Sequence, residues 1–372
     1  MKTMYTLFCE QKNTYYGQEL CAETLFSGVH CSQSCEALIH SYFTWGHKHE
    51  LFHLNFIDQY IARGKHTHTV SLYLLGIALA GLFQDPVYRH LQSFLPELDG
   101  WYDKDRDASY TWFLTCLYHD VASCIEQTKI PEDPTERQKT LDYYLGDLNI
   151  QYSPYQAFPY RVDHIPFRFS EQLVKNYFFY RACSGYCEHG ILAGYLFFDR
   201  YVKTFMRHVK GTLREGTEAV LDTDRNGQSL LWHKEHLSHA AYVADAIICH
   251  DLWMCGKEDE QTYRSYGLAP LIPGEQGKSE LSIDDYPLQF MLCFLDTIEP
   301  IKRFAPEGAD NNLSAKDVLE YVSVEPHNRG LKLDWKPAIS QHADFARWFH
   351  ALKGMETWMK ISFNETTKEF SW

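Results

Sequence analysis

The residues best suited to chemistry begin with the adjacent pair His119-Asp120, near the end of the apolar stretch YTWFLTCLYHDVASCIE at residues 110–126. Apolar side chains recur in this stretch with the spacing of a helix buried along one broad face, and no Gly or Pro interrupts it. An ionised carboxylate buried without a partner costs several kcal/mol, so Asp120 needs a cation or a hydrogen-bond network. The pair alone is compatible with a structural contact in the core or with metal binding.

Further histidines and carboxylates lie on other apolar, helix-like segments. Taken with the pair, the six candidate ligands in chain order are His68, His119, Asp120, His189, His250 and Asp296. Imidazole and carboxylate donors without thiolate suit Fe, Mn, Ni, Zn, Co or Mg. Because a metal ion takes about four protein ligands, the set allows one or two divalent ions. With two ions Asp120 is expected to bridge, since a carboxylate offers two oxygens and an imidazole one available lone pair.

Helical periodicity indicates the elements that must position these side chains. In KHTHTVSLYLLGIALAGLF, His68 shares one stripe with Leu72, Leu75 and Leu79, which places it in the first turn of a buried helix. His66 lies on a different face of that helix. It is therefore expected to be exposed or to contact a substrate.

Three more helical runs carry the later candidates. His189 lies in a long run that begins at Ser170, and Asp296 lies in DYPLQFMLCFLDTIEPIKRF, where Pro300 is expected to kink or end the helix. The run HLSHAAYVADAIICHDLWMCG holds His239 and His250 on one face but about 16 Å apart along its axis. His239 is therefore expected to line the pocket or to support a ligand.

The pattern predicts a mostly α-helical protein. Residues 1–45 form an N-terminal segment and residues 46–309 a helical domain, in which a Pro-, Tyr- and Asp-rich stretch at about 129–168 is an insertion or lid. From residue 310 to 372 short alternating segments surround one helix, which predicts a small α+β appendage.

The composition limits the partners. The 372-residue chain has a formal net charge of −14, which argues against a nucleic-acid surface, although a metal can make a pocket attractive to a small phosphorylated molecule. There is no run of 18 apolar residues and no signal-like start, and the 11 cysteines fit reduced core thiols. We therefore expect a cytoplasmic protein without a membrane span. The oligomeric state does not follow from the sequence.

The order of the candidate ligands resembles that of the HD superfamily of metal-dependent phosphohydrolases, H…HD…H…H…D. The resemblance covers about residues 60–305 and rests on the segments KHTHTVSLYLLG, LYHDVAS, EHGILAGYLF, AAYVADAIICHD and PLQFMLCFLDTIEP. It implies a helical HD-type domain in which the six candidate ligands hold one or two metals. No Gly-Tyr-Pro signature follows His250, which argues against a cyclic-di-GMP phosphodiesterase of the HD-GYP type.

The resemblance also implies an activity, the hydrolysis of a phosphomonoester or phosphodiester bond in a small, nucleotide-like molecule by metal-activated water. The basic residues Lys65 and Arg303 are expected to neutralise phosphate charge, and Glu188 to protonate the leaving oxygen or to orient a ligand. Two alternatives remain, a nucleotide-binding regulator with weak turnover and an HD nuclease acting on single strands.

Overall fold

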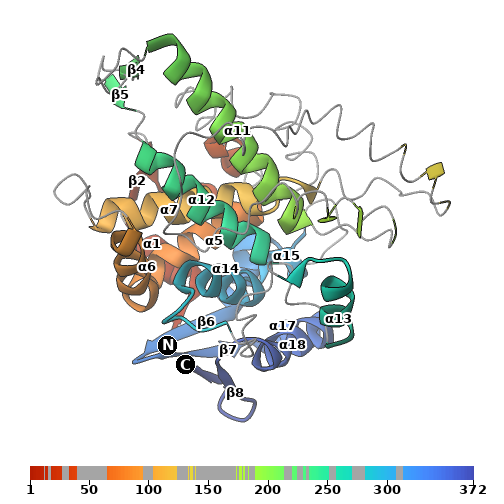
Figure 1. Ribbon diagram of the computed structural model, residues 1–372. Helices are drawn as coiled ribbons and strands as arrows, with labels where there is room; N and C mark the ends of the chain where they lie inside the picture. The colour runs from red at the N-terminus through yellow and green to blue at the C-terminus, as the bar shows by residue number, and fades with distance from the viewer. Residues whose placement is uncertain are drawn as a thin grey trace.

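The protein is described from a computed structural model. The residues that it describes are 1–11, 13–15, 18–26, 33–39, 65–94, 104–123, 189–212, 220–223, 229–231, 234–250, 257–269, 281–306 and 313–372, with a few single or paired positions between 133 and 183. Within them the chain is mostly helical, with a small antiparallel sheet near the C-terminus (Figure 1). The predicted fold class, mostly α with an α+β appendage, is confirmed. The expected insertion lies almost entirely outside the described residues.

Five helices carry the candidate site. They are α5 (His66–Ala78), α7 (Lys104–His119), α11 (His189–Thr212), α12 (Lys234–Cys249) and α14 (Pro287–Ile298). Other helices that the structure describes include α1 (Met4–Glu10), α2 (Ala22–Leu25), α6 (Ala80–Phe94), α13 (Lys257–Ser265), α15 (Ile301–Phe304), α16 (Ala315–Tyr321), α17 (Pro337–Ser340), α18 (Phe345–Gly354) and the 3-10 turn η7 (Met355–Thr357).

Helix α7 lies at the centre of the bundle and packs against α5, α6, α11 and α12. Every residue of α5 from His66 to Gly76 is buried, including the polar residues of its first turn. The two helices approach closely at Gly76, where a Cβ atom would lie 2.0 Å from Nε1 of Trp112. Nε1 of Trp112 occupies this space and donates a hydrogen bond to the carbonyl of Tyr73 at 3.1 Å. Glycine and tryptophan together therefore fix how α5 crosses α7.

The sheet joins the two ends of the chain. Its five strands run in the order β1 (Lys2–Thr3), β6 (Val322–His327), β7 (Gly330–Trp335), β9 (Glu369–Ser371) and β8 (Ser362–Asn364), and all neighbours are antiparallel. Strand β1 pairs Lys2 with Val324, so the N-terminus adds an edge to a sheet otherwise built from C-terminal residues. Two separate hairpins are formed by β2 (Asn13–Tyr15) with β3 (Gln18–Leu20) and by β4 (Val220–Thr223) with β5 (Ser229–Leu231).

Helix α14 is packed between the bundle and the C-terminal residues (Figure 1). Phe294 meets the rings of Phe370 and Trp372 at centroid distances of 5.2 and 5.1 Å. On α18, Nε1 of Trp348 donates to the carbonyl of Thr297 at 3.0 Å. The appendage therefore holds the end of the helix that carries Asp296.

Among the helices that the structure describes, none is by itself long and apolar enough to cross a membrane. Helices α5 and α6 reach that length and composition only when taken together, and they meet at a bend of 88°.

Candidate metal centre

The pair His119-Asp120 lies where α7 ends. The helix closes at His119, and Asp120 opens the turn that follows, so the predicted burial of both residues holds but the helix stops inside the pair. Nδ1 of His119 donates to the carbonyl of Cys116 at 2.7 Å. Because the last carbonyls of a helix have no partner within it, this bond satisfies one of them and turns Nε2 of His119 away from its own helix.

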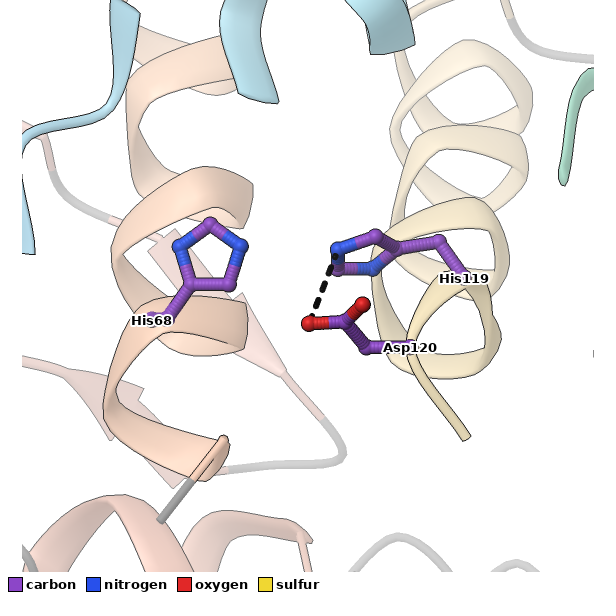
Figure 2. A group of neighbouring side chains, drawn as sticks. All are labelled: His68, His119 and Asp120. Carbon is purple, nitrogen blue, oxygen red and sulfur yellow. Dashed lines mark ion pairs between the residues drawn. The ribbon is translucent and has the colours of Figure 1, made fainter. Parts of the chain in front are cut away.

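A first group of ligand atoms forms between α7 and α5. His68, His119 and Asp120 each offer one atom, and these atoms all lie within 4.8 Å of one another (Figure 2). Asp296 joins them from the last turn of α14, with Oδ1 3.0 Å from Nε2 of His68 and 3.7 Å from Nε2 of His119. We call these four residues the first subsite.

A second group shares Asp120 and is completed by His189 and His250. Nε2 of His189 lies 2.9 Å from Oδ1 of Asp120 and 3.3 Å from Nε2 of His250. As with His119, Nδ1 of His250 donates to the carbonyl three residues earlier, that of Ile247, at 2.6 Å. We call Asp120, His189 and His250 the second subsite.

Asp120 lies between the two subsites. Its Oδ1 faces His189, whereas its Oδ2 lies 3.6 Å from Nε2 of His119. The two oxygens of one carboxylate thus face histidines of different subsites. This is the arrangement that a carboxylate bridging two ions requires.

The residues fit a metal ion because buried donor atoms point inward without hydrogen-bond partners. Within the described part of the chain, Nε2 of His68, Nε2 of His119 and Oδ1 of Asp296 are such atoms: both nitrogens face the oxygen, at 3.0 and 3.7 Å, without a hydrogen bond of normal geometry. Each buried polar atom left unpaired costs about 1–3 kcal/mol. A cation among them would remove that cost, and nitrogen with oxygen donors suits a divalent first-row metal or magnesium.

Among the described residues, neither group of candidate ligands includes a cysteine. Cys116 is buried one turn before Asp120, and burial together with the charge of Asp296 raises the pKa of its thiol well above the ordinary value. The thiol therefore stays protonated. The donors are imidazole and carboxylate, as the sequence predicted.

Two lysines balance the two aspartates. Nζ of Lys65 lies 3.1 Å from Oδ2 of Asp120, and Nζ of Lys302 contacts Oδ2 of Asp296. Burial acts against both carboxylates, but Lys65 with its neighbouring histidines holds the pKa of Asp120 well below its ordinary value. Lys302 with His119 and His68 does the same for Asp296. Both aspartates are therefore ionised at neutral pH.

Arg303 is half-buried on α15 beside this pair of carboxylates. Burial and the nearby Arg347 lower the pKa of its guanidinium, while Asp296 and Asp120 act in the opposite direction. Of the two predicted phosphate-binding residues, Lys65 thus pairs with a candidate ligand, and Arg303 interacts electrostatically with two of them. Glu188, the predicted proton donor, lies outside the described residues.

Glu299 is a site residue that the sequence interpretation missed. It is fully buried just after α14, and its Oε2 lies 2.6 Å from Nδ1 of His68. Its Oε1 accepts a 2.6 Å hydrogen bond from the hydroxyl of Ser71. A signal was present, because Glu299 follows Asp296 by three residues and could therefore reach the same face. Pro300 ends α14 as predicted, and Glu299 occupies the C-cap position.

The structure also places two histidines outside the candidate ligand set. His66 is 2% exposed, so the expectation that it is exposed was wrong, because α5 is buried on all sides at its start. Nε2 of His239 lies 2.7 Å from the hydroxyl of Thr111, two turns before His119 on α7. His239 therefore contacts the helix that carries the pair, which agrees with a supporting position.

Comparison with models of protein families, with curated proteins and with solved structures gave no match. The chemistry of the site is therefore argued from the chain's own residues. They form a mostly helical protein with two buried His/Asp groups that could hold metal ions.

Proposed function

We propose that the chain is a metal-dependent phosphohydrolase of the HD type, which cleaves a phosphomonoester or phosphodiester bond in a small, nucleotide-like molecule. The observation that carries the proposal is the convergence of the six candidate ligands, from five helices or helix ends, into two groups that share Asp120. Unrelated structural His–Asp pairs in a core would not be expected to converge on one shared carboxylate.

Two divalent ions held there would supply a water of lowered pKa as nucleophile and would neutralise charge on the phosphoryl oxygens. The chain's own part is to fix the ions and to place cations around the phosphate. Lys65 precedes α5 and Lys302 lies on α15, and each pairs with an aspartate oxygen. With ions bound to the aspartates, both ammonium groups become available to phosphate oxygens.

The charge balance favours an anionic substrate. The buried carboxylates of Asp120 and Glu299 and the partly buried one of Asp296 are matched by Lys65 and Lys302, and Arg303 interacts electrostatically with both aspartates. Two divalent ions added to this balanced set leave a strong local positive charge. A phosphate ester enters such a pocket in spite of the negative charge of the whole chain.

The test is a substrate screen with the purified chain and added Mn²⁺. It uses p-nitrophenyl phosphate, its bis-ester, nucleotides, cyclic dinucleotides and single-stranded DNA. We expect turnover of a small ester and loss of at least about a hundredfold in Asp296→Asn, because ligand-set changes cost this much or more. Asp284→Asn is the matched control, since Asp284 is an exposed aspartate paired with Arg329.

The same screen decides between the alternatives. Micromolar nucleotide binding without turnover under any metal would replace the proposal with a regulatory role. Cleavage of single strands alone would favour a nuclease, which the net charge of −14 counts against.

A further inference from the structure

We propose that the two subsites bind metal unequally, that the first holds its ion tightly while the second exchanges, and that Glu299 is the positioning residue that makes the difference. The inference rests on the metal centre of the proposed function.

Glu299 holds His68 in one tautomer. Its carboxylate lies in the core and accepts from four groups, the imidazole of His68, the hydroxyl of Ser71 and the backbone N–H groups of Ile301 and Lys302. Since Oε2 can only accept, Nδ1 of His68 carries the proton. The lone pair on Nε2 of His68 is thereby directed at the first subsite, where that atom faces Oδ1 of Asp296 at 3.0 Å without a hydrogen bond of normal geometry.

Nδ1 of two other candidate ligands, His119 and His250, bonds to a neutral group instead. His119 donates to the carbonyl of Cys116 and His250 to the carbonyl of Ile247. A carboxylate in this position makes the imidazole a stronger ligand than a carbonyl does, and its loss lowers metal affinity by about 10- to 100-fold. Among these three histidines, only His68 of the first subsite has that support.

The charges around the two subsites also favour tighter metal binding at the first. The first subsite has Asp296 and Glu299 in addition to the shared Asp120, whereas the described residues of the second subsite have Asp120 alone. Lys302 pairs with Oδ2 of Asp296 and leaves Oδ1 facing His68. A cation is therefore attracted more strongly to the first subsite.

The second subsite is also the more open. The side chain of His189 is 24% exposed, whereas in the first subsite those of His68 and His119 are 2% and 1% exposed and that of Asp296 is 15% exposed. An ion beside His189 can reach solvent without displacing the core. We therefore expect one resident ion, and a second that enters and leaves with the free metal concentration.

The test is calorimetric titration of the chelator-treated full-length chain with Mn²⁺, supported by metal analysis after dialysis. We expect two classes of site whose dissociation constants differ by more than about tenfold. Glu299→Gln, which keeps the size of the side chain but removes its charge, should weaken the tight class by about 10- to 100-fold and leave the weak class within about twofold. Glu320→Gln, the same change on partly exposed α16, should alter neither class.

His189→Ala provides an assignment that does not depend on Glu299. It should abolish the weak class and leave one ion bound with the tight constant. Two metal sites with equal dissociation constants in the wild type would overturn the inference, as would a weak site that is still present in His189→Ala. A Glu299→Gln variant that is folded by circular dichroism and retains the tight constant would also overturn it.

These outcomes are separate from those of the substrate screen. Unequal metal binding without phosphate-ester turnover would refute the proposed function and leave this inference standing. Phosphate-ester turnover by a chain whose two sites bind metal equally would support the proposed function and refute this inference.

Discussion

At the scale of single residues, the site depends on how buried donors are oriented. Backbone carbonyls at helix ends orient His119 and His250, and a buried carboxylate orients His68. Each bond occupies Nδ1 and leaves Nε2 directed toward the site. Because no imidazole has to reorient when an ion arrives, the site is preorganised for binding.

The ionisation of His68 predicts how metal affinity responds to pH. Burial opposes the charged ring, but Glu299 and Asp296 together raise the pKa of His68 above its ordinary value of 6.5. A protonated Nε2 cannot bind a metal, so affinity in the tight class should fall as the pH falls, beginning above 6.5. Mn²⁺ titrations between about pH 8 and about pH 6 measure this effect. Affinity unchanged across that range would contradict it.

The same raised pKa of His68 makes the stability of the metal-free chain depend on pH in the opposite direction. A raised folded-state pKa means that the protonated form of His68 is stabilised by folding. That contribution is fully present below the unfolded value of 6.5 and is lost as the pH rises through the folded-state pKa. Metal binding and folding of the apo chain therefore respond to pH in opposite directions at this histidine.

Residue types and spacing predicted the six candidate ligands, because each stands out as a polar side chain on an apolar helix. Glu299 was missed because it follows the helix, where the 3.6-residue pattern ends. The pairing of Lys65 with Asp120 and of Lys302 with Asp296 was also not predicted. Such contacts depend on how helices distant in sequence cross, which periodicity does not specify.

At the scale of elements, the candidate ligands gather at helix ends. His68 and His189 lie at the starts of α5 and α11, whereas the others lie at or near the ends of α7, α12 and α14. The C-terminal end of a helix carries a partial negative charge, so three of these five ends favour a cation. The position of the site therefore depends on where each helix stops, which single-sequence patterns predict least well.

The contact between α11 and α12 gives an element-scale prediction. Gly190 follows His189, and a Cβ atom there would lie 2.8 Å from both Nδ1 of His250 and the carbonyl oxygen of Ile247. Gly190→Ala should therefore push α12 away, break the bond that orients His250 and weaken the second subsite. Overpacking of this kind costs about 1–3 kcal/mol, which thermal unfolding and Mn²⁺ titration can measure.

Gly81→Ala is the matched control for this prediction. Gly81 is exposed on α6, and no heavy atom lies within 4 Å of its added Cβ. Alanine there should be neutral or stabilising by up to about 1 kcal/mol and should leave both metal constants unchanged. Equal effects of the two substitutions would show that Gly190 has no special place beside His250.

At the scale of the whole molecule, the C-terminal residues are structurally continuous with the helical bundle. Phe290 and Phe294 of α14 pack against Trp372, and Trp348 donates to the carbonyl next to Asp296. Figure 1 shows both chain ends on this side of the molecule. Strand β1 was not predicted to join the sheet, because a strand of two residues has no detectable alternation of its own.

Removal of residues 313–372 should therefore abolish more than the appendage. It exposes Phe290 and Phe294, and each buried phenylalanine contributes about 1.5–3 kcal/mol. We expect a chain that is insoluble or that has lost the tight metal class, as measured by sedimentation and metal analysis. Arg329→Ala, which breaks only an exposed ion pair with Asp284, should leave both properties intact. A soluble truncated chain with full metal content would contradict this view of the molecule.

We propose that one carboxylate serves both metal subsites, and the substitution Asp120→Asn tests this claim. The measurement is the number and affinity of Mn²⁺ ions bound by the folded variant beside the wild type, each titrated after chelator treatment. A shared Asp120 predicts that this one substitution weakens both classes of site, by about tenfold or more each. A variant that loses one class and keeps the other at its wild-type constant, or that keeps both, would contradict the claim.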